Sequence, residues 1–462
     1  MIFQDVVSPI IVAPLAAFAV SGGISYTLVL VLFIAIFFDA SETLLRMRAF
    51  AKNKTLLSVF RNKIGGEPPL DNISLSVIVP AYKRVSELKR CLKCLVDSGI
   101  PKEQIFVIDD YSNDNFQTAT FASAQGVKVI SLSRNTKKVG AVNIGLGFVN
   151  TKYVLLLDAD SLLVANYSQL NKAILEMEKL QLDAMAGMVL PYNPAPESSG
   201  HSSNILFGIQ RLEYEQAMKL GRGSMYSLDS IQKDNEVSVD NFKVKRAEVM
   251  NVSGAFGIFR TEALRKTSDA YQNAEEIFAG EDLERTFKML ATNGKVGYSD
   301  ELLIYTSSPI TVKSHFKQRV TWAEGFFRCF CSRFGAGICR KKVSTLTYVT
   351  YLIRDILLHP LKLLFLPLLI IDFPLFLVLL AFYLILNLTV TMVLNGGKQF
   401  SKRATFLLSF YRLYLLLIPT TIGYVKGLLH VTKIAILKSN GRNMVPPIKI
   451  IKTWNIEGAN FA

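Results

Sequence analysis

Long stretches without a charged side chain lie near both ends of the chain, and such stretches fold most readily inside a lipid bilayer. Residues 6–38 carry no charge, and residues 373–397 form a second uncharged run of 25. At about 1.5 Å rise per residue, either stretch is longer than the roughly 30 Å hydrocarbon core of a membrane. No basic segment precedes the first stretch, as a secretory signal peptide would require, since the first basic residue is Arg46. We therefore predict an N-terminal membrane anchor over residues 1–45.

The basic residues indicate which side of the membrane the chain occupies. Residues 46–73, a predicted basic linker, contain Arg46, Arg48, Lys52, Lys54, Arg61 and Lys63, whereas the charged residue before the uncharged stretch is Asp5. Positive charge on this side predicts a cytoplasmic location for the chain after residue 45. Lysine and arginine (52) exceed aspartate and glutamate (37), which gives a net charge of +15. Because no nucleic-acid-binding motif accompanies this charge, we expect a lipid bilayer rather than nucleic acid as the partner.

The C-terminal region, residues 341–437, is predicted to hold transmembrane and interface helices. Residues 373–397 form one span, while the charged segments 348–371 and 406–437 fit spans, in-plane helices or helices that face a polar interior. The loop at 398–403 and the tail at 438–462 are both basic, which predicts that both are cytoplasmic. The chain should then be a multi-pass cell-membrane protein that crosses the bilayer an even number of times in this region.

Residues 74–340 read as a separate α/β domain placed between the membrane segments. Short apolar runs at 75–79, 105–108, 127–132, 153–157 and 184–190 alternate with helical periods such as 85–96. This alternation predicts βαβ units with parallel strands covered by helices. In such sheets ligands bind beyond the carboxyl ends of the strands, so the polar residues that follow each run are the candidate site.

Acidic residues follow several of these predicted strands. Asp109 and Asp110 end the second run, and Asp158 and Asp160 follow the buried run 153–157. Paired carboxylates at such a point suit a divalent cation, although an aspartate can also cap a helix. Asp282 lies in the first turn of a predicted helix, where it fits either a general base or a partner of the helix dipole.

Six short motifs in order resemble those of membrane-embedded processive family 2 glycosyltransferases, the group that includes hyaluronan, chitin and cellulose synthases. They are residues 76–82 (SVIVPAY), 109–112 (DDYS), 138–143 (KVGAVN), 158–160 (DAD), 280–282 (GED) and 318–322 (QRVTW). The resemblance implies a GT-A-type nucleotide-sugar-binding α/β domain in the cytoplasm, inserted between transmembrane helices. It also implies that Mg²⁺ or Mn²⁺ serves as cofactor.

The resemblance also implies roles for individual residues. Nucleotide contacts fall to Tyr82, Asp109 or Asp110, and Lys138, while Asp158 reaches the donor, Asp160 holds the metal ion and Asp282 acts as the base. Ser253 and Gly254 lie in a segment that resembles the acceptor site of hyaluronan and chitin-type synthases. Gln318 and Trp322 belong to the last motif, in which Trp322 would form a platform for the acceptor sugar, although it also fits a core position.

One position of the last motif departs from the family pattern. Thr321 stands where the family has an arginine, and its hydroxyl is a single neutral donor where an arginine would pair with a diphosphate. Arg319, Lys317 and Arg328 are the candidate replacements. The departure puts donor affinity and processivity in doubt.

Together these features predict an inverting glycosyltransferase that transfers a sugar from a UDP-sugar to a growing β-linked polysaccharide and exports the chain through its own helices. A non-processive enzyme that modifies a lipid or short glycan acceptor is the alternative. A membrane transporter or scaffold with a degenerate nucleotide-binding domain is a third. Near the C-terminus, residues 452–454 (KTW) faintly resemble a gating loop over the nucleotide and equally fit an exposed membrane anchor.

Overall fold

The computed structural model describes most of the chain, apart from both termini and several internal segments, some of which lie in the C-terminal region. The described residues are 24–65, 74–192, 201–227, 236–239, 242–245, 249–268, 280–331, 356, 359–364, 368–370, 372–395, 406–408, 410–411, 417–439 and 450–455. The first half of the predicted anchor, most of the segment 348–371 and the basic loop at 398–403 lie outside these residues.

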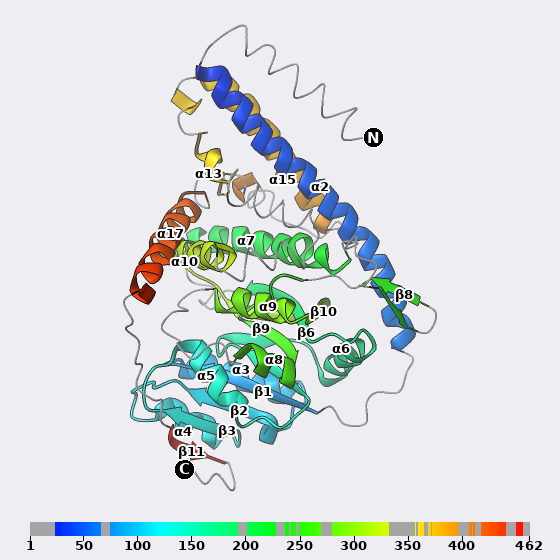
Figure 1. The fold of residues 1–462 in the computed structure, drawn as a ribbon, viewed down its shortest axis with the longest axis vertical. Coiled ribbons are helices and arrows are strands. Elements are labelled where there is room, and N and C mark those ends of the chain that lie inside the picture. The colour runs from blue at the N-terminus through cyan, green and yellow to red at the C-terminus, as the bar shows by residue number, and fades with distance from the viewer. Residues whose placement is uncertain are drawn as a thin grey trace.

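A nine-stranded sheet forms the centre of the molecule, with the order β11-β3-β2-β1-β4-β9-β6-β10-β5 (Figure 1). Its strands are β1 (Leu75–Ala81), β2 (Ile105–Asp109), β3 (Lys128–Leu132), β4 (Tyr153–Leu157), β5 (Ser161–Leu163), β6 (Ala184–Tyr192), β9 (Phe256–Arg260), β10 (Val296–Ser307) and β11 (Ile450–Trp454). A separate hairpin pairs β7 (Glu236–Val239) with β8 (Phe242–Lys245).

The parallel half of the sheet confirms the predicted alternation. β1 lies between β2 and β4 and runs parallel to both, and β2 runs parallel to β3. Every residue of β2 and β4 is buried, as expected for strands with helices on both faces. The helices of this half are α3 (Val85–Asp97), α4 (Gln117–Ala124) and α5 (Lys137–Leu146), whereas α6 (Tyr167–Lys179) packs on β6 and β10.

The other half of the sheet is mixed, which the predicted parallel arrangement did not include. β9 runs antiparallel to β4 on one side and to β6 on the other, and β10 pairs parallel with β6. β9 is only five residues long and carries Gly257, so its sequence gives a weak strand signal. The helices of this half are α7 (His201–Gln216), α8 (Thr261–Ser268) and α9 (Glu281–Ala291).

The C-terminal strand β11 adds to the far edge of the sheet, antiparallel to β3. Trp454 packs edge-to-face on Phe116 with ring centroids 6.0 Å apart. The side chain of Asn455 donates hydrogen bonds to the carbonyl groups of Ser123 and Val127. The segment 452–454 is therefore part of an edge strand, and neither the gating loop nor the membrane anchor describes it.

The first described helix, α2 (Ile24–Ile64), continues without a break from the apolar stretch into the basic one. Its 41 residues span about 60 Å, so the helix reaches from the top of the molecule along the side of the sheet domain (Figure 1). Arg61, near its end, forms ion pairs with Glu176 and Asp300 at 2.8 and 2.9 Å. The predicted boundary at residue 45 thus falls inside one continuous helix.

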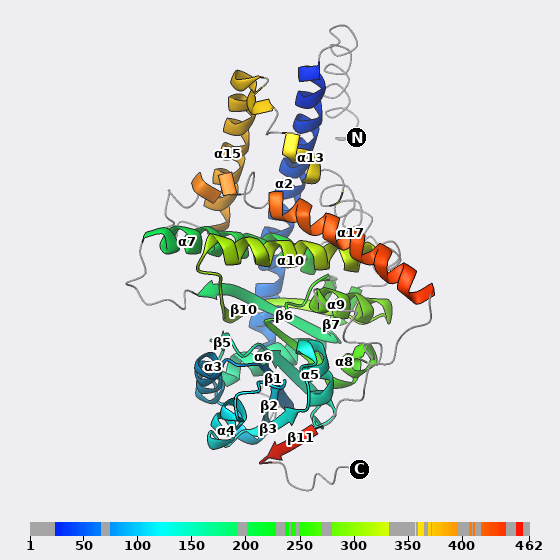
Figure 2. The same cartoon turned by 90° about the vertical axis from the view of Figure 1, so that its left-hand side faces the viewer.

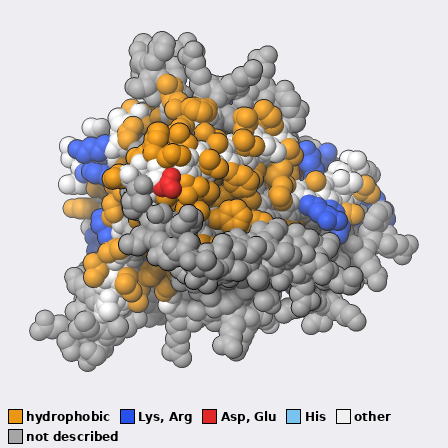
Figure 3. All heavy atoms as spheres, turned by 90° about the horizontal axis from the view of Figure 1, so that it is seen from above, with side chains coloured by type: hydrophobic (Ala, Val, Ile, Leu, Met, Phe, Trp, Pro, Cys, Tyr) orange, Lys and Arg blue, Asp and Glu red, His pale blue; other side chains and the backbone are white. Residues whose placement is uncertain are grey.

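Within the described residues, one helix is long and apolar enough to cross a membrane, over Phe373–Leu394. It lies in α15 (Phe373–Asn395), which runs beside α2, whereas α10 (Val312–Cys331) and α17 (Leu417–Ser439) lie across that direction (Figure 2). The short helix α13 (His359–Leu361) lies near them. Seen from above, the described surface is largely hydrophobic, with lysine and arginine side chains at its margins (Figure 3).

Candidate functional site

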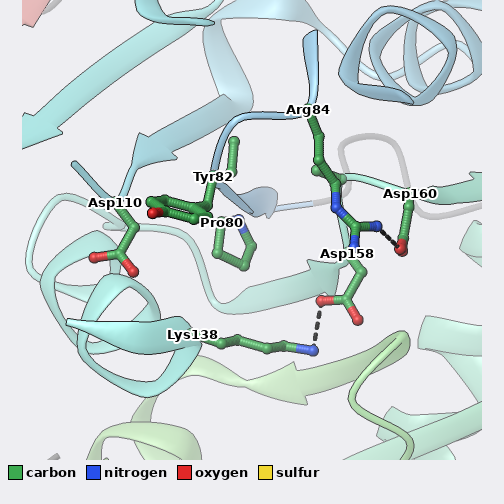
Figure 4. A pocket seen from close by; sticks show the side chains of 9 residues that line it. Pro80, Tyr82, Arg84, Asp110, Lys138, Asp158 and Asp160 are labelled. Carbon is green, nitrogen blue, oxygen red and sulfur yellow. Dashed lines mark hydrogen bonds and ion pairs between the residues drawn. The ribbon is translucent and has the colours of Figure 1, made fainter. Parts of the chain in front are cut away.

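A cleft of about 300 Å³ lies where β1, β2 and β4 end, as the strand order predicts. It is lined by Pro80, Ala81, Tyr82, Arg84, Asp110, Lys138, Asp158, Ala159 and Asp160 (Figure 4). Tyr82 is 45% exposed, so its ring is open to a ligand. Five of the residues singled out from the sequence meet here, together with Arg84, whose role the sequence alone did not suggest.

The two aspartates at the end of β2 have different surroundings. Asp109 is buried and accepts hydrogen bonds from the Ser131 hydroxyl at 3.0 Å and the Ser112 backbone N–H at 3.1 Å. Asp110 lines the cleft and accepts from the backbone N–H and the hydroxyl of Thr136 at 2.6 and 2.8 Å. Burial raises the pKa of Asp110 to about 6 despite these bonds. Of the two, Asp110 is the candidate ligand-binding group, and Asp109 fixes the strand end.

Lys138, from the first turn of α5, bridges two parts of the site. Its ammonium group lies 2.5 Å from the carboxylate of Asp158 and donates to the carbonyl oxygen of Gly254 at 2.6 Å. Burial raises the pKa of Asp158, and the neighbouring Asp160 adds to the rise against the effect of Lys138. The carboxylates of Asp158 and Glu281 outweigh the burial of Lys138 and raise its pKa, so the lysine remains charged.

Asp160 pairs with Arg84, whose side chain is 51% exposed (Figure 4). In the described part of the chain, no three side chains of histidine, cysteine, aspartate or glutamate gather as a metal cage. The site instead offers the two hard carboxylates of Asp158 and Asp160 beside an open cleft. Mg²⁺ commonly binds through one or two carboxylates and takes its other ligands from phosphates and water, so this donor set fits a metal ion that arrives with a diphosphate.

Asp282 lies beside Lys138 at the start of α9. One oxygen of its carboxylate accepts the Gly254 backbone N–H and the other accepts the Leu283 backbone N–H, both at 2.9 Å. A Cβ atom on residue 254 would lie 2.9 Å from the ammonium nitrogen of Lys138, so glycine allows the two chain segments to approach. Ser253 is half-buried, and its hydroxyl accepts a hydrogen bond from the Ala255 N–H at 3.3 Å.

Glu281 is an acidic group of this site that the sequence did not single out. A Cβ atom on residue 254 would lie 3.5 Å from its carboxylate oxygen. Burial raises the pKa of Glu281, and the adjacent Asp282 raises it further. Its position next to Asp282 in the sequence was the available signal. The site thus holds a base candidate with a second carboxyl group beside it.

The last motif lies on α10, outside the residues that line the described cleft. Trp322 is 48% exposed, and the guanidinium carbon of Arg319 lies 4.4 Å from the centre of its ring system. Arg319 is itself buried and pairs with Glu213 at 2.6 Å. Because about half of Trp322 is exposed, its surroundings fit a platform for the acceptor sugar better than a position in the protein core.

Thr321 and Gln318 also belong to this motif. The Thr321 hydroxyl donates to the backbone carbonyl of Lys317 at 3.0 Å, within its own helix. The side-chain oxygen of Gln318 is buried without a hydrogen-bond partner. Neither the position of the missing family arginine nor the neighbouring Arg319 therefore presents a free cation to a ligand.

The fold and the acidic cleft at the strand ends define a GT-A-like α/β domain. Residues 76–267 match the family described as Glycosyl transferase family 2. This part of the chain is similar to family 2 glycosyltransferases, and the predicted resemblance is confirmed.

Two curated relatives show sequence similarity to this chain. The chain is 24% identical over 272 residues to the poly-beta-1,6-N-acetyl-D-glucosamine synthase of Staphylococcus epidermidis, and the match covers 58% of each chain. It is 23% identical over 253 residues to the protein of that name from Staphylococcus aureus strain COL, and that match covers 54% of each. The chain thus matches a little more than half the length of these relatives.

Two solved structures show weaker likeness. A mannosyltransferase from Pyrobaculum calidifontis in complex with GDP-Man and Mn²⁺ has a TM-score of 0.48 at 14% identity, over 86% of this chain and 99% of that one. The TarS protein of Staphylococcus aureus has a TM-score of 0.35 at 18% identity, over 63% of this chain and 47% of that one.

Proposed function

We propose that the protein is a polysaccharide synthase that transfers a sugar from a UDP-sugar to a growing β-linked chain, with inversion at the anomeric carbon. The observation that carries this proposal is the meeting of Asp282, Lys138 and Asp158 around Gly254 beside one open cleft. Because the curated relatives are named as poly-beta-1,6-N-acetyl-D-glucosamine synthases, UDP-N-acetylglucosamine is the first donor to test.

Asp282 acts as the general base in this proposal. Two backbone N–H groups hold its carboxylate in place, which fixes the direction of its remaining lone pairs. Asp282 takes the proton of the acceptor hydroxyl while the acceptor oxygen bonds to the anomeric carbon and the bond from that carbon to the diphosphate breaks. The nucleoside diphosphate leaves with the electron pair of that bond. A single displacement of this kind inverts the anomeric centre and needs no covalent enzyme intermediate.

The other residues bind and orient the substrates. Tyr82 and Asp110 contact the nucleotide, Lys138 neutralises charge between donor and base, and Asp158 orients the donor. Asp160 would hold Mg²⁺ or Mn²⁺, which when bound neutralises the charge that develops on the leaving diphosphate.

The acceptor binds on the side of Asp282. Ser253 and Gly254 contact the incoming sugar next to the base, and Gln318 and Trp322 bind the glycan further out, with the half-exposed indole ring as the platform.

The membrane parts complete the proposal. We place α2 and α15 in the lipid bilayer and the family 2 domain on its cytoplasmic side, because the basic end of α2 packs on that domain. The growing chain would be exported through these helices. The proposed anchor, linker, domain, C-terminal helices and tail are residues 1–45, 46–73, 74–340, 341–437 and 438–462, with α2 continuous across the first boundary and β11 of the tail joined to the sheet of the domain.

A non-processive transfer to a lipid or short glycan is the second candidate, and Thr321 is the observation that favours it. A chain that must be held through many additions needs tight donor and acceptor sites, and this position offers no cation. A scaffold with a degenerate domain is the less favoured candidate, because Asp160 lines the cleft and Asp282 accepts a hydrogen bond from the Gly254 N–H next to Lys138.

The test uses the full chain, purified in detergent with Mg²⁺ or Mn²⁺ and a panel of UDP-sugars. UDP release and a product that a specific glycosidase digests are expected, and a long product supports the synthase. Short products favour the second candidate, and no UDP release with any donor contradicts both.

The variant Asp282→Asn tests the base assignment. It should lower turnover by about 10²- to 10⁴-fold while UDP still binds. Asp97→Asn is the matched control, because Asp97 is an exposed aspartate that pairs with the exposed Lys93 and does not line the cleft. Full activity of a folded Asp282→Asn variant would refute the assignment.

A further inference from the structure

In the family pattern, an arginine at position 321 would pair with the donor diphosphate. Thr321 supplies no such basic side chain here. Thr321 bonds only within its own helix, and the guanidinium of Arg319 pairs with Glu213 and is buried. Among the described residues that line the cleft, Arg84 and Lys138 are the basic ones. Arg84 and Lys138 are therefore the candidate replacements at the cleft, whereas Lys317 and Arg328, like Arg319, lie on α10 outside its lining.

The surroundings of the two side chains differ. Lys138 is fixed between the Asp158 carboxylate and the Gly254 carbonyl oxygen, and three acidic groups raise its pKa against the effect of burial. The side chain of Arg84 is 51% exposed and contacts Asp160 (Figure 4). Lys138 is held as a fixed charge, whereas Arg84 can change partner without leaving a buried charge unpaired.

The backbone at the end of β1 directs Arg84 into the cleft. Lys83 adopts a left-handed conformation with φ of +54°, and its N–H donates to the Ser112 hydroxyl at 3.0 Å. Its ammonium group lies 5.2 Å from the centre of the Tyr82 ring. Of the two adjacent basic residues, Arg84 is the one that lines the cleft.

We propose that Arg84 binds the donor diphosphate in place of the arginine absent at position 321, and that it leaves Asp160 to do so when a divalent cation binds that carboxylate. This inference rests on the proposed function. The planar guanidinium presents several N–H donors in a fixed fork, which suits two phosphate oxygens at once. Without nucleotide, Arg84 forms an ion pair with the Asp160 carboxylate and competes with the metal ion for this carboxylate.

If Arg84 leaves Asp160 to bind the diphosphate, removing Arg84 should change the affinities for two ligands in opposite directions. Affinity for a nucleoside diphosphate should fall, because a charged donor to the phosphates is lost. Affinity for a divalent cation alone should rise, because Asp160 no longer has a competing partner. Replacing a residue that only supports the fold would instead lower the affinity for both ligands.

The experiment compares the full-length wild type with Arg84→Gln, in detergent. Arg90→Gln is the matched control, since Arg90 lies on the adjacent helix α3 and stacks on Tyr192 at 5.6 Å without lining the cleft. Equilibrium binding is measured for UDP and for uridine in the presence of Mg²⁺. Binding of Mn²⁺ alone is followed by the electron paramagnetic resonance signal of the free ion.

We expect Arg84→Gln to lower the affinity for UDP about ten- to a hundredfold and to change the affinity for uridine by no more than about twofold. The affinity for Mn²⁺ should rise several-fold. Arg84→Lys should recover part of the UDP affinity, and Arg90→Gln should match the wild type. Equal losses for UDP and uridine, or unchanged Mn²⁺ affinity, would overturn the proposal. A wild type that does not bind UDP at all would overturn the proposed donor, whereas tight UDP binding by both wild type and Arg84→Gln overturns the Arg84 role alone.

Discussion

The ion pair between Glu213 and Arg319 links α7 to the helix that carries Trp322, and breaking it should be costly. Arg319 is 4% exposed, pairs with Glu213 at 2.6 Å and donates to the Tyr411 hydroxyl at 3.3 Å. The change Glu213→Gln keeps the shape of the side chain and removes its charge. The guanidinium then stays buried without a counter-ion, and the pKa of Arg319, which Glu213 raises against the effect of burial, falls.

The size of the effect follows from the burial of the pair. Removing one partner of a buried ion pair costs about 3–5 kcal/mol, and we take about 3 kcal/mol because the amide oxygen of glutamine can still accept a hydrogen bond. For a domain of this size, 1 kcal/mol shifts the midpoint of thermal unfolding by about 2–4 °C. The expected fall is therefore about 6–12 °C, measured by intrinsic fluorescence in detergent.

Two further variants separate the ion pair from other causes. Glu262→Gln removes one partner of an exposed pair with Lys266 and should leave the unfolding midpoint unchanged. The double variant Glu213→Gln/Arg319→Met removes both buried charges and should recover most of the stability. It should still raise the acceptor KM a few-fold, because Trp322 loses the cation 4.4 Å from its ring while the turnover number stays nearly constant. An unchanged midpoint for Glu213→Gln, or a double variant less stable than the single one, would refute this reasoning.

Three other changes test the site and its supports. Gly254→Ala should displace Lys138 and lower turnover at least about tenfold, with little change in thermal unfolding, because the new Cβ atom would lie 2.9 Å from the lysine nitrogen. Burial raises the pKa of Asp110 from 3.8 to about 6, so the folded state binds more protons than the unfolded state between these values. Stability should therefore fall as pH rises through this window, and Asp110→Asn should remove that slope in unfolding midpoints measured from pH 4 to 7. Arg61→Met leaves the buried Glu176 without its main cation and should cost about 3–5 kcal/mol, seen as a lower unfolding midpoint.

The sequence predicts the parallel half of the sheet well, because each of those strands is a short apolar run followed by polar residues. β2 and β4 are completely buried, so their patterns are uninterrupted. β9 and β11 were not predicted as strands. The first contains a glycine, and the second is a five-residue edge strand with a lysine in a basic tail, so neither has the apolar signal of a central strand.

Residue type and order also suggest the candidate site, but not its internal contacts. Asp109 and Asp110 are adjacent in the sequence, and only the structure shows that the first is enclosed by hydroxyl groups while the second lines the cleft. Lys138 meets Gly254 across 116 residues of chain, and Arg319 meets Glu213 across 106. Such pairings depend on the whole fold, because no local periodicity connects segments so far apart.

The pairing of β11 with β3 also constrains how the C-terminal region can cross a membrane. The chain leaves the sheet domain after α10, which ends at Cys331, and returns to the same sheet at Ile450. A segment that starts and ends on one side of a bilayer crosses it an even number of times. If α15 crosses, a second crossing must therefore lie elsewhere between these two residues. Strand pairing and chain connectivity thus favour the same even number of crossings as the basic residues do, and independently of them.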